Sequence, residues 1–180
     1  ASAKKGAYVC VSNVHRCIQT FDSADFRAVV NGADLVIPDG RPIFWCQRLL
    51  GAEDAEQVRG QDIMSALCAA SAEQAGGKGL KIGLYGGSSD DVLDLVKARL
   101  GKKYPGIDIS YAYSPPFRAL TAEEDTKVVA AINAAEVNVL FVGIGCPKQE
   151  RWMAEHKVRL NCVMLGVGAA YDFISGSKKH

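Results

Sequence analysis

The sequence predicts an α/β fold in which helices flank a mostly parallel sheet of about six strands. Short apolar runs alternate with amphipathic stretches of helical period, and polar or glycine residues follow the apolar runs. A chain of 180 residues suits one compact domain with a buried core. We therefore expect a single domain over residues 1–180.

The expected strands are six short runs rich in β-branched and aromatic residues. They cover residues 7–12, 34–38, 80–86, 107–113, 137–143 and 161–167. Helices are expected between them, because successive parallel strands need a crossover connection.

Capping signals mark two of the helices. Ser23 precedes a helix that meets Gly32 at its end. Thr121 and Glu124 have the spacing of a capping box and open a helix that runs to Ala135.

Three more helices are expected from other signals. After strand 80–86, a serine cap, early acids and late bases indicate a helix that closes at Gly101. Pro147 is typical of a helix start. A further helix is expected over residues 41–50.

Composition argues against several classes of protein. Lys and Arg total 21 against 20 Asp and Glu, so we expect no nucleic-acid partner. No apolar run reaches the roughly 18 residues of a membrane span. The motifs GxSxG, HExxH, Walker A and CxxC are absent, and the three histidines lack metal-ligand spacing, so no metal site is predicted.

The cysteines lie far apart in the sequence, which favours free thiols in a reducing cytoplasm. We expect them to be small core or site-lining residues. They are Cys10, Cys17, Cys46, Cys68, Cys146 and Cys162.

The turns that follow the strands carry the candidate site. In a parallel sheet these turns meet at the carboxyl edge, where ligands bind. Glycines let the backbone approach a ligand, and helix N-termini favour an anion such as a pyrophosphate, so the edge is predicted to bind a nucleotide. The candidates in these turns are Asn13, His15, Asp39, Gly40, Gly86, Gly87, Ser88, Gly143, Gly145, Lys148, Gln149, Gly168 and Asp172.

Several of these residues have a purely structural alternative. Asp39 is either a catalytic carboxylate at a strand end or the N-cap of helix 41–50. His15 could serve only as a structural hydrogen-bonder, and Lys148 only as a solvated charge. Gln149 is a better candidate for a site residue than Lys148.

Two other functions remain open at this point. A nicotinamide-dependent oxidoreductase would need a GxGxxG fingerprint, but the GxG at residues 166–168 has Tyr171 in the third glycine place. A nucleotide-binding module without turnover is the second alternative.

Seven segments together resemble the WecG/TagA/CpsF glycosyltransferase family, in order and over nearly the whole chain. The PDG and GxPKQExW motifs are the most specific of them. The segments are NVH, ADLVIPDGRPIFW, VRGQDIM, GLYGGSSDDV, YSPPFR, LFVGIGCPKQERW and GVGAAYDFISG.

This resemblance implies a Rossmann-like, inverting bacterial transferase. It would move N-acetylmannosamine, its uronic acid or a related hexose from a UDP-sugar to an undecaprenyl-pyrophosphate-linked saccharide, with no obligatory metal cofactor. The products would be teichoic acid, exopolysaccharide or a related surface polysaccharide.

The resemblance also implies roles for particular residues. Asp39 falls on the PDG aspartate, the general base, while Asn13 and Gln149 fall on residues of the sugar site. Near VRGQD the sequence departs from relatives, with Gln57 where they carry an arginine and Arg59 later. Arg59 is a candidate substrate-binding residue, but which residue meets the donor phosphates there stays open.

Relatives usually have a further strand and helix before the first motif and a basic, amphipathic C-terminal segment. We expect this chain to lack both. In the family that segment holds the enzyme on the inner face of the cytoplasmic membrane, so a cytoplasmic, peripheral location is implied. Self-association stays open.

Overall fold

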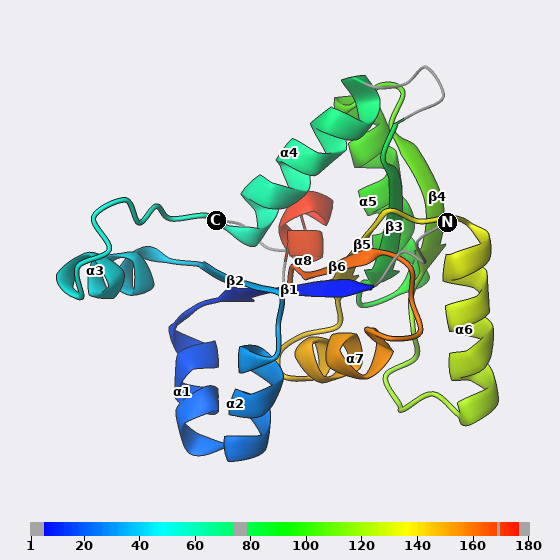
Figure 1. The fold of residues 1–180 in the computed structure, drawn as a ribbon. Coiled ribbons are helices and arrows are strands. Elements are labelled where there is room, and N and C mark those ends of the chain that lie inside the picture. The colour runs from blue at the N-terminus through cyan, green and yellow to red at the C-terminus, as the bar shows by residue number, and fades with distance from the viewer. Residues whose placement is uncertain (1–5, 74–78, 169, 177–180) are drawn as a thin grey trace, which may run out of the picture.

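The computed structural model describes residues 6–73, 79–168 and 170–176, and one six-stranded sheet organises them (Figure 1). Every strand pair is parallel, which confirms the predicted fold class. All six predicted strands are present, with ends within two residues of the expected ones. They are β1 (Ala7–Ser12), β2 (Leu35–Pro38), β3 (Lys81–Gly86), β4 (Asp108–Tyr113), β5 (Val139–Gly143) and β6 (Val163–Gly166).

The strand order places a topological switch inside the sheet. The order is β2-β1-β6-β5-β3-β4. From β3 the chain moves outward to β4 at one edge of the sheet, and from β5 it moves the other way, to β6. The connections therefore diverge between β3 and β5. These two strands end side by side, with Gly86 paired to Gly143. Ligands of open α/β sheets bind at such a point.

Five of the helices confirm the prediction, and three were missed. Of the three, α1 follows Asn13 so closely that its sequence reads as part of a turn, α8 is short, and α4 is a run of small residues with weak periodicity. The helices are α1 (Val14–Asp22), α2 (Ala24–Asn31), α3 (Arg41–Leu49), α4 (Gly60–Glu73), α5 (Asp90–Lys103), α6 (Ala122–Ala134), α7 (Lys148–His156) and α8 (Ala170–Ser175).

Most of the predicted helix ends are correct. Ser23 caps α2, Gly32 ends it, and both hydrogen bonds of the Thr121 capping box are present at α6. The expected end of α5 at Gly101 is wrong, because the helix runs on to Lys103. Nothing lies near a Cβ at Gly101. Glycine is tolerated there within a regular helix.

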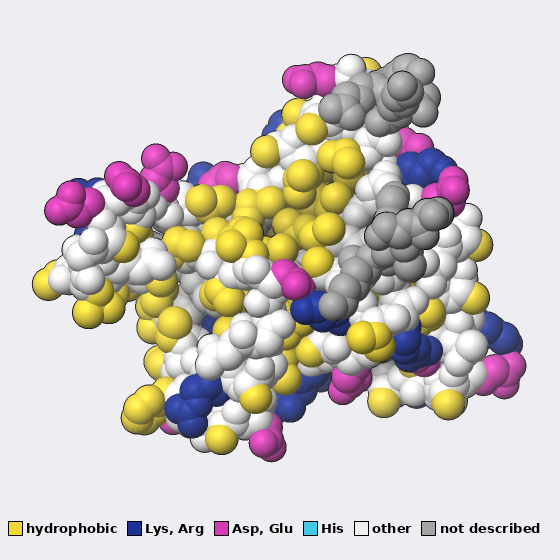
Figure 2. Space-filling model, viewed as in Figure 1, with side chains coloured by type: hydrophobic (Ala, Val, Ile, Leu, Met, Phe, Trp, Pro, Cys, Tyr) yellow, Lys and Arg dark blue, Asp and Glu magenta, His cyan; other side chains and the backbone are white. Residues whose placement is uncertain are grey.

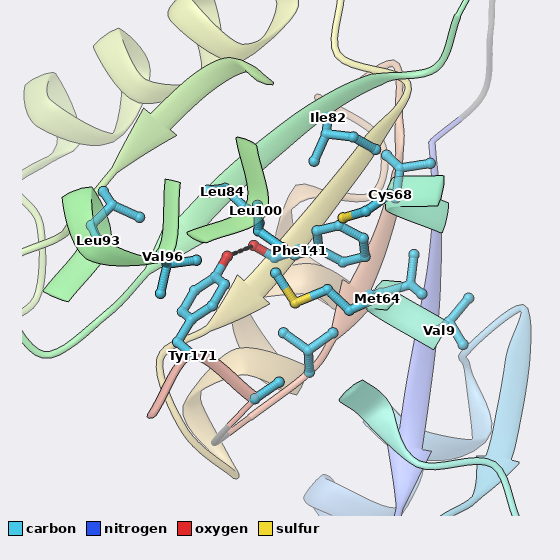
Figure 3. Close-up of a cluster of buried hydrophobic side chains, with 14 residues drawn as sticks. Val9, Met64, Cys68, Ile82, Leu84, Leu93, Val96, Leu100, Phe141 and Tyr171 are labelled. Carbon is cyan, nitrogen blue, oxygen red and sulfur yellow. Dashed lines mark hydrogen bonds between the residues drawn. The ribbon is translucent and has the colours of Figure 1, made fainter. Parts of the chain in front are cut away.

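Two hydrophobic cores cover the two faces of the sheet. Helices α4, α5 and α8 pack on one face, where Met64, Val96 and Phe141 are fully buried (Figure 3). Tyr171 of α8 points into the same core, and its hydroxyl donates to the Phe141 carbonyl at 2.8 Å. Helices α6 and α7 cover the other face around Met153 and neighbouring side chains.

Helix α3 stands away from the sheet at the β2 edge (Figure 1), and none of its residues is buried. A broad patch of hydrophobic side chains lies between α3 and α4 (Figure 2). Across the described ranges, no helix has the length and hydropathy to span a bilayer.

The cysteines match the prediction only in part. All six are free, and Cys10, Cys68 and Cys162 are buried core residues. Cys17 and Cys46 are exposed instead, so a place in the core is wrong for these two residues. The reason is that α1 and the detached α3 turn these positions toward solvent.

Candidate functional site

A cavity of about 950 Å³ opens at the carboxyl ends of β3 and β5, at the topological switch. Its walls come from the turns after β3, β4, β5 and β6, and from α6 and α7. Half of the predicted site residues line it: Gly87, Ser88, Gly143, Gly145, Lys148, Gly168 and Asp172.

Two glycines allow the strand ends to meet beside this cavity. Gly86 has φ +142°, and a Cβ there would lie 2.4 Å from the Gly143 carbonyl oxygen. A Cβ on Gly143 would lie 2.6 Å from the Tyr171 ring. Contacts this short exclude any larger side chain. Gly86 is buried and supports the cavity without lining it.

One face of α7 and of the turn after it forms a polar wall that the sequence analysis did not identify. Lys148, Trp152, Glu155 and Arg159 recur at spacings of three and four residues, and all line the cavity. The helical spacing of these residues in KQERWMAEHKVR is the sequence signal from which this wall could have been predicted. Lys148 is exposed at the first turn of α7 and pairs with none of the described acids.

Stacked rings support this wall from behind. Trp152 stacks on Tyr85 at 4.3 Å and on His156 at 4.1 Å between ring centroids. Asp125 of α6 hydrogen-bonds His156 at 2.7 Å and Arg159 at 2.5 Å. Burial alone would raise the pKa of Asp125, but the bonds from Arg159 and His156 outweigh it and the pKa is lowered.

Asp39 lies directly after β2 and outside the cavity lining. Its backbone N–H donates to the Ser12 carbonyl at 2.7 Å, which ties the β2 turn to the end of β1. Gly40 occupies the N-cap of α3 with φ +91°, and no side chain caps that helix. The alternative of Asp39 as the N-cap is therefore wrong.

The environment of Asp39 suits a base. Burial raises the pKa of its carboxyl, and Asp62 adds to that effect. The positive charges of Arg16 and Arg59 act in the opposite direction, but burial prevails. A raised pKa makes a carboxylate a stronger proton acceptor.

Three more predicted residues lie near the ends of β1 and β2. Arg59 donates to Asp62 in the first turn of α4, with Nε 2.8 Å from Oδ2, and its charge acts on Asp39. Asn13 caps α1 by accepting from the Arg16 backbone N–H at 3.1 Å. His15 is exposed in the first turn of that helix.

Gln149 is completely buried and does not line the cavity. Its side-chain Nε2 donates to Glu150 Oε1 at 2.8 Å. Glu150 in turn forms a buried ion pair with Arg16. Neither charged residue was predicted as part of the site, because 134 positions separate them and their contact forms only in the fold, although Glu150 falls within the GxPKQExW motif.

The predicted site residues therefore form two groups at one sheet edge. One group lines the cavity at β3, β5 and β6, and the other surrounds Asp39 at β1 and β2. In the strand order, β2 lies two spacings from β6, roughly 10 Å, and three spacings from β5, roughly 15 Å. Among the described residues, no three His, Cys, Asp or Glu side chains cluster as metal ligands.

Sequence comparison identifies the family. The model of the glycosyl transferase WecG/TagA/CpsF family matches residues 1–180. The chain belongs to this family. The matched residues include the Asp39 turn and the start of α7, which belong to the two groups of site residues.

Curated relatives in the family share one name, N-acetylglucosaminyldiphosphoundecaprenol N-acetyl-β-D-mannosaminyltransferase. The Bacillus spizizenii protein is 26% identical over 97% of this chain and 65% of its own length. The Staphylococcus aureus protein is 28% identical over 86% of this chain and 57% of its own length. The chain thus spans somewhat less than two thirds of the curated relatives it matches.

Proposed function

We propose that this chain is the catalytic core of an inverting glycosyltransferase. It would move N-acetylmannosamine, its uronic acid or a related hexose from a UDP-sugar to an undecaprenyl-diphosphate-linked saccharide in bacterial surface polysaccharide synthesis. The observation that carries the proposal is the cavity at the β3–β5 switch, with its glycine turns and with Lys148, which pairs with no described acid, on the same sheet edge as Asp39. The printed activity of the relatives supports it.

In the proposed reaction Asp39 is the general base. Its carboxylate accepts the proton of one acceptor hydroxyl, and that oxygen bonds to the anomeric carbon of the donor. The bond from the anomeric carbon to the phosphate oxygen breaks on the opposite face, so the configuration inverts and UDP leaves. A positioned base of this kind contributes about 10²- to 10⁴-fold to the rate.

The leaving diphosphate needs positive charge, and the cavity offers it. Lys148 at the N-terminus of α7 and the turns at Gly87 and Gly145 line the space where the diphosphate would lie. We propose that these groups act without an obligatory metal. Turnover unchanged by a chelator supports this point, and turnover restored only by added Mg²⁺ or Mn²⁺ contradicts it.

The acceptor implies a place in the cell. A polyprenyl-linked acceptor is held in a membrane, so we propose that the enzyme works in the cytoplasm at the inner membrane face. Self-association and contact with the membrane through a basic C-terminal segment stay predictions.

The direct test is turnover with UDP-N-acetylmannosamine and an undecaprenyl-diphosphate-linked N-acetylglucosamine acceptor. Asp39→Asn should lower turnover by about 10²-fold or more, while UDP affinity changes little. Asp54→Asn, an exposed acid, is the matched control. NMR of the product's anomeric centre reports the stereochemistry. Equal loss of turnover and UDP affinity in Asp39→Asn would remove Asp39 from the role of base.

The other two functions make different predictions. An oxidoreductase should bind NAD, but the chain lacks the intact dinucleotide fingerprint. A module without turnover should bind UDP and show the same biological output after Asp39→Asn.

A further inference from the structure

A buried ion pair joins α1 to α7 beside the candidate site. Arg16 is 4% exposed, and Glu150 is fully buried. The guanidinium Nη2 donates to Glu150 Oε1, and Nη1 donates to the Val11 carbonyl of β1. Burying two charges costs solvation free energy that their attraction often fails to return. A role beyond stability therefore has to be considered for this pair.

On the β1 side, the contacts of Arg16 reach two predicted site residues. Its backbone N–H donates to Asn13 Oδ1 at 3.1 Å, and its side chain holds Val11. The next residue, Ser12, accepts the backbone N–H of Asp39 at 2.7 Å. One side chain thus braces the strand end to which the Asp39 turn is tied.

On the α7 side, Arg16 reaches Gln149 through Glu150. The same carboxylate oxygen that receives Arg16 also accepts the Gln149 Nε2–H at 2.8 Å. This bond fixes which way the Gln149 amide faces. Its Oε1 is buried and has no hydrogen-bond partner among the described residues.

The charge of Arg16 also acts on Asp39. The charged groups that act on Asp39 are Arg16 from α1, Arg59 just before α4, and Asp62 from the first turn of α4. Burial raises the pKa of Asp39, Arg16 and Arg59 lower it, and Asp62 raises it. Because Arg59 is exposed and hydrogen-bonded to Asp62, Arg16 is the buried cation of this set.

We infer that Arg16 is the positioning residue of this site. Through β1 it holds Asn13 and the Asp39 turn, and through Glu150 it orients Gln149. Its buried positive charge also acts electrostatically on the Asp39 carboxylate. The expected effect of Arg16 on turnover rests on the proposed function, whereas its expected effect on the titration of Asp39 does not.

The test is the titration of Asp39 in the full chain, followed by NMR of ¹³C-labelled aspartate carboxyls and assigned with Asp39→Asn. Arg16→Gln alone would strand the Glu150 carboxylate in the core, so the main variant is R16Q/E150Q, and R16M/E150M is a second replacement of the pair. Two single variants serve as controls. E150Q keeps the Arg16 charge, and Arg27→Gln removes an exposed arginine of neighbouring α2.

The expected result is a higher Asp39 titration midpoint in both double variants and an unchanged midpoint in E150Q and Arg27→Gln. Thermal unfolding identifies which variants are folded. A folded double variant with the wild-type midpoint would overturn the electrostatic role.

Measurements of turnover test whether Arg16 positions the site residues. Arg16→Lys keeps the charge but lacks the planar fork whose two nitrogens donate to Val11 and Glu150. The value of kcat should therefore fall by about tenfold or more, while the pH dependence of turnover stays unchanged. Undiminished kcat in Arg16→Lys would overturn the positioning role. An inactive wild-type chain would count against the proposed function, and the titration would still decide the electrostatic role.

Discussion

Lys148 is the residue through which the cavity is expected to recognise the donor. It lines the cavity at the start of α7, and no described acid neutralises it. Lys148→Met should remove one charge-assisted contact worth about 1.5–3 kcal/mol, which weakens UDP binding by about ten- to a hundredfold. Isothermal titration measures this, with Lys102→Met on α5 as control. Equal affinities in the two variants would place the diphosphate elsewhere.

Asp39 sets the expected pH dependence of turnover. Its pKa is raised above the ordinary 3.8, chiefly by burial, and only the carboxylate form can accept a proton. The rate should therefore fall as pH falls through the raised pKa, and the acidic limb of kcat/KM should lie above pH 3.8. A limb that persists unchanged in Asp39→Asn would belong to another group.

Residues of the site differ in how visible they were in the sequence. Asp39, Gly40 and Lys148 stand in strand-end turns, where glycine and proline reveal the backbone geometry locally. Arg16 and Glu150 were not found, because their importance arises only when distant helices pack together. Gln149 was predicted, but its complete burial was not.

Among the elements, α6 owes its start to the capping box at the cavity rim. Thr121 Oγ1 accepts the Glu124 backbone N–H at 3.2 Å. Thr121→Ala should cost about 1 kcal/mol and lower the melting temperature by about 2–4 °C. Thr126→Ala, inside the same helix, is the control with little effect. Equal losses in the two variants would contradict the importance of the cap.

The ion pair between Arg118 and Glu124 at the start of α6 makes the stability of the folded state depend on pH. Hydrogen bonds from Arg118 lower the pKa of Glu124 from 4.5 to about 2. The folded state therefore gains stability from the carboxylate above pH 4.5 and loses it as pH falls toward 2. The melting-temperature difference between wild type and Glu124→Gln should shrink over that range. A constant difference would show that the ion pair contributes nothing.

Strands were predicted better than helices for a physical reason. Buried parallel strands are continuous apolar runs that local sequence reveals. Helix α1 starts directly after Asn13 and reads as part of a turn, α4 carries weak period, and α8 is short. The expected end of α5 failed because glycine can continue a helix as well as stop one.

At the scale of the molecule, the fold class followed from the alternation of strands and helices, but the place of the cavity did not. The β3–β5 switch depends on the strand order, and no local pattern encodes which strands pair. The turns could be assigned to one edge, but not divided into a cavity group and an Asp39 group.

The central claim is that the switch cavity binds a uridine nucleotide, and thermal unfolding with saturating UDP, and separately with NAD, tests it most directly. At about 100 times the dissociation constant, a ligand adds roughly 2.7 kcal/mol to stability, or about 5–10 °C in melting temperature. We predict a shift of that size with UDP and none with NAD, reduced in Lys148→Met at the same UDP concentration. A shift with NAD alone, or an equal UDP shift in Lys148→Met, would contradict the account.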